Sequence, residues 1–90
     1  MTKPSKTKPV AVPQTLGQAH SDVSRRRPPA ESTLVVQRKF HQDNKRLYES
    51  VADIDRGHHH EILYWVQYER NQIETLTELI RSGQTKVTPQ

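Results

Sequence analysis

Apolar residues recur at alternating intervals of four and three residues through the second half of the sequence, and this spacing constrains the fold more than any other feature. One ladder occupies positions 40, 44, 47, 51, 54 and 58. A second ladder occupies positions 62, 66, 69, 73, 76 and 80. A mean interval of about 3.5 residues is typical of a coiled-coil helix. The ladders therefore predict an all-α protein built on a coiled-coil-type helix.

The two ladders do not join smoothly. The step from 58 to 62 is four residues where the pattern requires three, and Gly57 lies beside it. Such an insertion locally unwinds a supercoil. The chain can continue as one helix over 33–82, or end a first helix near Gly57 and fold back as a helical hairpin. We favour the long helix, because glycine inside a helix costs only about 1 kcal/mol and the histidines that follow offer no N-cap.

Both ends of the helical region carry boundary signals. Ser32 or Thr33 is suited to cap the first turn. Arg81 places a cation in the last turn, and Gly83 tolerates the left-handed conformation that often follows a helix. These signals predict an amphipathic helix over 32–82 and a disordered tail over 83–90.

The first third of the chain has a different composition. Five of the six prolines lie at or before Pro29, and the apolar residues there show no regular period. Residues 1–31 carry six basic and two acidic residues, whereas 32–90 carry eight of each, so the net charge of +4 belongs to the first segment. This composition predicts a disordered basic arm over 1–31. Its cation cluster, Arg25, Arg26 and Arg27, is a candidate contact for phosphate or for an acidic protein surface.

A single long helix cannot bury its own apolar stripe, so the ladders predict a partner. The segment 62–68 carries more large apolar side chains than a two-stranded seam uses, which favours three or four helices or a groove on a larger protein. The alternative is that Trp65 is ordinary core inside a hairpin. The predicted partner-contact residues are Phe40, Leu47, Val51, Ile54, Ile62, Trp65, Val66, Ile73, Leu76 and Ile80.

Polar residues occupy three ladder positions: His58 ends the first ladder, whereas Asn44 and Glu69 interrupt the two ladders from within. A polar side chain in a helical seam lowers stability but can fix the register of the helices. The alternative is that Asn44 and Glu69 face solvent.

The sequence does not predict catalysis. The chain has no cysteine, and its three glycines form no phosphate-binding loop. Three adjacent histidines, His58–His60, point about 100° apart on a helix and cannot converge on one ion. We therefore expect a protein that is not an enzyme and that has no cofactor and no metal site.

The leading functional prediction is a small non-catalytic scaffold or adaptor subunit that assembles with itself or with helices of a larger complex. One alternative is a nucleic-acid-associated protein whose arm contacts phosphate while the helix oligomerises. Another is a helical inhibitor or regulator that docks in a groove of its partner. No apolar run approaches the roughly 18 residues needed to span a bilayer, so we expect no membrane span. We expect a cytoplasmic location, with the nucleus as the alternative because of the arginine cluster.

Overall fold

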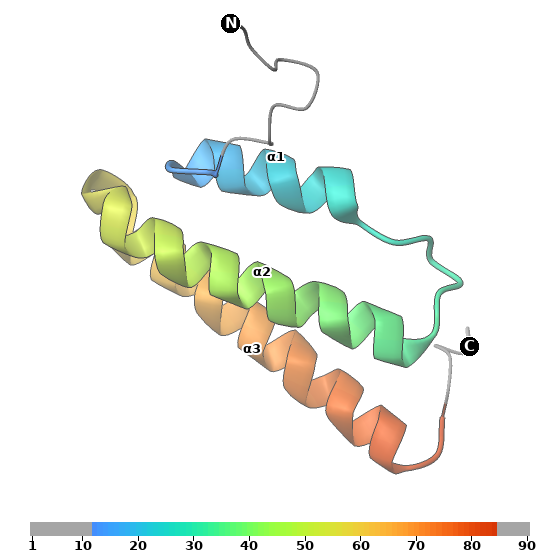
Figure 1. The fold of residues 1–90 in the computed structure, drawn as a ribbon. Coiled ribbons are helices and arrows are strands. Elements are labelled where there is room, and N and C mark those ends of the chain that lie inside the picture. Colours follow the sequence, from blue (N-terminus) through green and yellow to red (C-terminus); the bar gives the residue numbers. More distant parts are fainter. Residues whose placement is uncertain (1–11, 85–90) are drawn as a thin grey trace, which may run out of the picture.

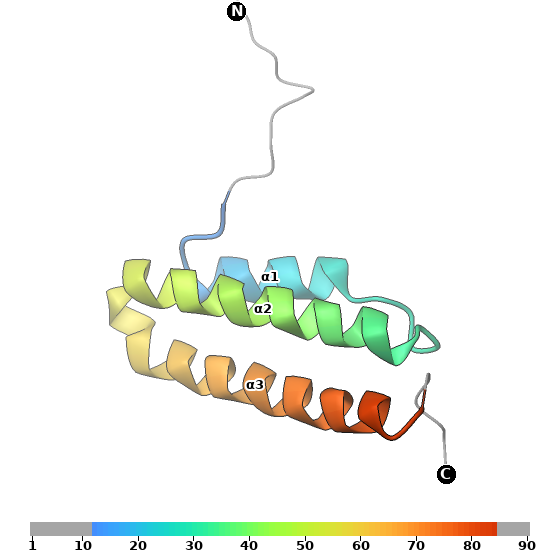
Figure 2. The same ribbon diagram turned by 60° about the horizontal axis from the view of Figure 1, so that its bottom comes forward.

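The computed structural model describes residues 12–84, which form three α-helices. These are α1 (Leu16–Arg26), α2 (Leu34–Ile54) and α3 (His59–Arg81), with a 3-10 turn at Arg56–His58. The all-α prediction is therefore confirmed. α2 lies between its two neighbours and runs antiparallel to both, so α1 and α3 point the same way (Figures 1 and 2).

The favoured single helix over 33–82 is wrong, and the hairpin alternative describes the chain. α2 ends at Ile54, and α3 packs back along it. Gly57 does not cause the reversal by a left-handed conformation, because its φ is not positive. The residue that leaves the helix is Asp55, with φ −90° and ψ 75°. α3 begins at His59 with no side-chain capping bond from His58, so the missing N-cap that favoured the long helix does not prevent a second helix.

Asp55 ties this turn to the start of α1. Its Oδ2 accepts the backbone N–H of Leu16 at 2.9 Å and lies 2.9 Å from Nδ1 of His58. The Leu16 N–H is one of the donors that a helix N-terminus leaves without an intrahelical partner. This backbone hydrogen bond from Leu16, followed by the contact with His58, holds the pKa of the Asp55 carboxyl below its ordinary value. The turn between α2 and α3 therefore depends on a residue 39 positions earlier in the sequence.

The two ends of the predicted helical region are confirmed. The Thr33 hydroxyl accepts the N–H of Val36 at 3.2 Å and caps α2. After α3, Gly83 has φ +95° and its N–H donates to the carbonyl of Ile80, while the N–H of Gln84 donates to the carbonyl of Leu79. This pair of bonds is the Schellman motif that a glycine after a helix favours.

The prediction of a disordered arm over 1–31 is wrong for Leu16–Arg26, which forms α1. Thr15 caps this helix, because its hydroxyl accepts the Gln18 N–H at 3.1 Å, and Gln18 Oε1 accepts the Gln14 N–H at 2.9 Å. A threonine followed three positions later by glutamine is a capping-box pattern. The predicted disorder of residues 1–11 and 85–90 lies outside the described residues.

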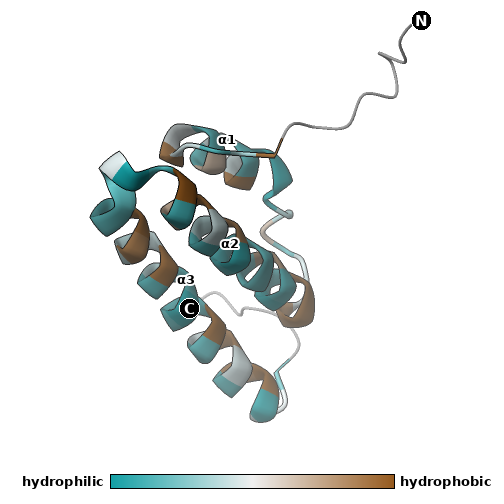
Figure 3. Ribbon diagram, turned by 60° about the vertical axis from the view of Figure 1, so that its left-hand side comes forward, coloured by the Kyte–Doolittle hydropathy of each residue, from teal (hydrophilic) through white to brown (hydrophobic). Residues whose placement is uncertain are grey.

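The core lies where α1 packs against the hairpin. Leu47 and Trp65 are partly buried against it, and Figure 3 shows hydrophobic segments of α2 and α3 along the strip between them. Its buried members are Leu16, Ala19, Val23, Phe40, Tyr48, Val51, Ala52, Ile62 and Val66. The chain therefore covers much of its own apolar stripe, which corrects the expectation that another chain must do so.

These backbone conformations predict opposite effects for alanine at two glycines. Gly83→Ala should lower the free energy of unfolding by about 1–2 kcal/mol, because a Cβ is strained in the left-handed region. Gly57→Ala should be neutral or stabilise by up to about 1 kcal/mol, because no heavy atom lies within 4 Å of the added Cβ and the unfolded chain loses freedom. Urea unfolding followed by Trp65 fluorescence measures both. A large decrease in the free energy of unfolding of Gly57→Ala would contradict this description of the turn, and so would an elongated dimer.

Candidate functional site

A groove of about 370 Å³ lies between α1 and α3, with α2 at its floor. α1 and α3 each pack along α2, while their backbones approach one another little, and this arrangement leaves the groove open. We call it the α1–α3 groove. Its lining residues are His20, Val23, Ser24, Arg27, Tyr48, Trp65, Tyr68 and Glu69.

Trp65 is the centre of an aromatic cluster at this groove. Its ring centroid lies 4.9 Å from that of His20, 5.5 Å from that of Tyr68 and 5.2 Å from that of Tyr64, each in an edge-to-face arrangement. The Tyr48 ring stacks at 6.2 Å. Such aromatic pairs contribute about 0.5–1.5 kcal/mol beyond the area that they bury. The cluster therefore joins all three helices through one half-buried indole.

The Tyr48 side chain forms the floor and is only 1% exposed. Its hydroxyl lies 2.8 Å from Nδ1 of His20, which satisfies the buried phenol by a hydrogen bond between α2 and α1. Burial, and next the negative charge of Glu69, raise the pKa of Tyr48 to about 12. The phenol therefore stays protonated through the physiological range.

Glu69 brings a carboxylate into the same region. Its side chain is 3% exposed, and Oε1 lies 2.5 Å from Nδ1 of His41. A buried carboxylate is costly unless it is paired, so the His41 contact is a condition for its burial. Glu69 is thus a buried ladder position that also lines a groove.

Asn44 is the other polar residue that interrupts a ladder, and it is completely buried. Its Oδ1 accepts a hydrogen bond from Nη2 of Arg26 at 2.8 Å, while Nδ2 has no partner within the described residues. The solvent-facing alternative is therefore wrong for both Asn44 and Glu69. A role in fixing helix register stays a prediction.

The three arginines of the predicted cation cluster make contacts within the chain. Arg25 pairs with Asp22, and Arg26 Nε lies 2.7 Å from an oxygen of the same carboxylate. The guanidinium of Arg27 lies 5.3 Å from the centroid of the Phe40 ring, and that of Arg26 lies 5.7 Å away. Residues 12–84 contain ten basic and ten acidic residues, so the excess charge of the chain lies at Lys3, Lys6, Lys8 and Lys86, beyond the described part.

The predicted partner-contact residues divide into three groups. Half-buried positions are Leu47, Trp65, Ile73 and Ile80, and Ile54 is 49% exposed. The buried positions are Phe40, Val51, Ile62, Val66 and Leu76. Because these five side chains are buried within the chain, they do not form a free surface in this fold.

The apolar side chains that do reach the surface of α3 are different ones. Leu63 is 44% exposed, Tyr64 62% and Tyr68 39%. We call Tyr64 and Tyr68, which share one side of the helix at i and i+4 and both contact Trp65, the α3 apolar face. The surplus of large side chains in 62–68 is the signal that could have identified them, because the inward stripe needs only part of that segment. Smaller exposed sites lie at Val35 and Val36, at the start of α2.

The histidine triplet spans the end of the turn and the start of α3, because His58 ends the 3-10 turn and His59 and His60 are the first residues of the helix. His58 is exposed and contacts Asp55, and His59 Nδ1 lies 2.9 Å from the carbonyl of Ala52. Within residues 12–84, no three histidine, cysteine, aspartate or glutamate side chains are grouped as a metal site would require. Over the same residues, no helix combines the length and hydrophobicity needed to cross a bilayer.

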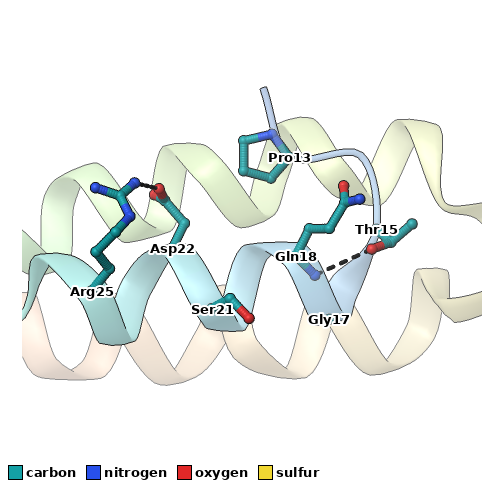
Figure 4. A pocket seen from close by; sticks show the side chains of 7 residues that line it. All are labelled: Pro13, Thr15, Gly17, Gln18, Ser21, Asp22 and Arg25. Atoms are coloured by element: carbon teal, nitrogen blue, oxygen red, sulfur yellow. Dashed lines mark hydrogen bonds and ion pairs between the residues drawn. The ribbon is translucent and has the colours of Figure 1, made fainter. Parts of the chain in front are cut away.

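A larger hollow of about 610 Å³ lies against the outer side of α1 (Figure 4). Small and polar residues line it, including Pro13, Gly17 and Ser21. Two of its side chains, Thr15 and Gln18, belong to the cap of α1, and Asp22 pairs there with Arg25. It contains no aromatic side chain, so the α1–α3 groove is the stronger candidate site.

Comparison with known proteins gives no functional assignment. No family model matches the chain, and no curated protein or solved structure matches it significantly. The function must therefore be inferred from the contacts of the chain itself.

The raised pKa of Tyr48 predicts an alkaline loss of stability. A tyrosine in the unfolded chain has a pKa near 10, whereas the pKa of folded Tyr48 is about 12. The contribution of Tyr48 to the free energy of unfolding is therefore complete below pH 10 and is lost as the pH rises to about 12. Tyr48→Phe should reduce this loss, and should also cost about 0.5–1.5 kcal/mol at pH 7 by removing the bond to His20. Urea unfolding at pH 8 and pH 11 measures both effects. Tyr64→Phe is the control. If it reduced the alkaline loss of stability as much as Tyr48→Phe does, the loss could not be assigned to Tyr48.

Proposed function

We propose that this chain is a non-catalytic adaptor that binds a protein partner through the α1–α3 groove and the adjoining α3 apolar face. The observation that carries this proposal is the exposure of Tyr64 and Tyr68 beside the half-buried Trp65. Clustered aromatic side chains at an open groove are typical of binding hot spots, where tryptophan and tyrosine are enriched. Part of the predicted contact set, notably Trp65, belongs to this site.

The arrangement of the helices favours a helical ligand. α1 and α3 lie on either side of α2 and point in the same direction (Figure 1). A fourth helix laid between α1 and α3 would complete a four-helix packing around the aromatic cluster. An amphipathic helix in an apolar groove is a common mode of peptide recognition.

Charge favours this proposal over the nucleic-acid alternative, and burial favours it over the helical inhibitor. Basic and acidic residues are equal in number over 12–84, and Arg26 is held by Asp22 and Asn44, so the three helices themselves lack the excess of cations that a phosphate-binding surface needs. A helical inhibitor that used the inward stripe of α3 would have to release Ile62 and Val66 from the core. Neither alternative needs an exposed aromatic face.

Site-directed photo-crosslinking tests the proposal. A photoreactive residue at Tyr64 should crosslink a specific protein in extracts of the source cells, whereas one at Ser50, an exposed position on the outer side of α2, should not. The crosslinked protein is then purified and its affinity measured. Tyr64→Ser and Tyr68→Ser should each weaken binding about tenfold or more, which corresponds to about 1.4 kcal/mol.

Equal crosslinking from Tyr64 and Ser50, or affinity unchanged in both tyrosine variants, would overturn the proposal. Crosslinking to a second copy of the chain would define the adaptor as a homo-oligomer. Salt-sensitive capture of DNA or RNA by the full chain, unaffected by the tyrosine variants, would favour the nucleic-acid alternative.

A further inference from the structure

We propose that the α1–α3 groove accepts an arginine side chain of the partner, with the Glu69 carboxylate as its counter-ion and the Trp65 ring as its stacking surface. This inference rests on the proposed function and specifies the chemistry of the partner. Three features of the groove support it: a buried carboxylate with an open oxygen, an aromatic wall and the balance of charge at the floor.

The carboxylate of Glu69 is built into the groove. The side chain is 3% exposed and lines the groove, yet only Oε1 is engaged, by Nδ1 of His41 at 2.5 Å. In the part of the chain that the structure describes, no hydrogen bond is made by Oε2. A buried carboxylate with one unengaged oxygen is an acceptor for a cationic donor, and charge-assisted hydrogen bonds are about twice as strong as neutral ones.

The aromatic wall suits a guanidinium group. Trp65 and Tyr68 line the groove next to Glu69, and their centroids are 5.5 Å apart. Planar guanidinium groups stack on aromatic faces, and tryptophan is the best such surface. The same fold already contains this contact, since Arg27 and Arg26 both lie over the Phe40 ring.

Charge at the groove floor favours a cation. Arg27 also lines the groove, but it is an exposed residue whose guanidinium lies over Phe40. Among the charged groups near Tyr48, Glu69 has a larger electrostatic effect on the pKa of that phenol than Arg26 or Arg27 taken singly. A guanidinium that enters the groove therefore approaches the buried Glu69 carboxylate. The competing cation, Arg27, is exposed at the edge of the groove.

The groove is also large enough for such a side chain. Its volume of about 370 Å³ lies at the lower end of the range of about 300–1,000 Å³ found for ligand sites. A single side chain presented by a docked helix fits this size better than a separate large ligand does.

Trp65 is the only tryptophan and reports on the groove directly. The full chain is titrated with N-acetyl-arginine amide and, separately, with N-acetyl-citrulline amide, which keeps the shape but removes the charge. We expect a saturable change in Trp65 fluorescence with at least tenfold tighter binding of the arginine compound. Glu69→Gln should abolish this preference. Glu74→Gln, an exposed position on the same helix, should retain it.

Three results would overturn the inference: no saturable change with either compound, equal affinity for both, or an unchanged preference in Glu69→Gln. Circular dichroism confirms that the variants fold. If Glu69→Gln does not fold, Tyr68→Leu removes the groove wall at a 39% exposed position and should weaken the arginine compound at least threefold.

The two proposals fail separately. A crosslinked partner that binds through Tyr64, but whose affinity does not depend on any of its arginines, would overturn the arginine site and leave the adaptor standing. Arginine binding at Trp65 in a chain with no Tyr64-specific partner would overturn the adaptor alone.

Discussion

The packing of α1 against the α2–α3 hairpin is the interaction on which the rest of the structure depends. α1 has 11 residues, and an isolated helix of that length is marginal in water. It is held by Leu16, Ala19 and Val23 in the core and by the Asp55 carboxylate at its N-terminus. α1 also covers an apolar strip that the α2–α3 hairpin alone would expose. The groove exists because α1 takes this position on α2 and stays apart from α3.

Polar contacts accompany this packing at each level of the bundle. Asp55 meets the start of α1, Tyr48 meets His20 near its middle, and Asn44 meets Arg26 at its end. A buried polar group left without a partner costs about 1–3 kcal/mol, so a shifted α1 would lose several of these contacts together. The contact between Tyr48 and His20 also places two aromatic rings of the groove. Stability and the proposed binding surface therefore share His20 and Tyr48.

The sequence predicted the outer limits of the hairpin well, because Thr33 and Gly83 act locally. It placed the turn near Gly57 only as the less favoured alternative, because Asp55 leaves the helix with a hydrogen-bond partner far away in the chain. α1 could have been predicted from the Thr15–Gln18 cap and the spacing of its apolar residues, but the nearby prolines favoured disorder. Trp65 was predicted as a contact residue. The groove beside Trp65 was not predicted. Its walls come from α1 and α3, and no local sequence pattern encodes how these two helices are placed relative to one another.

The central claim is that a single chain buries its own apolar strip beneath α1. The most direct measurement is nuclear Overhauser spectroscopy of the full chain, recorded over a range of concentrations beside sedimentation equilibrium. We predict contacts between the Trp65 indole and the His20 ring in a monomer, with intensities independent of concentration. An elongated dimer in which Trp65 shows no contact with α1 would contradict the claim.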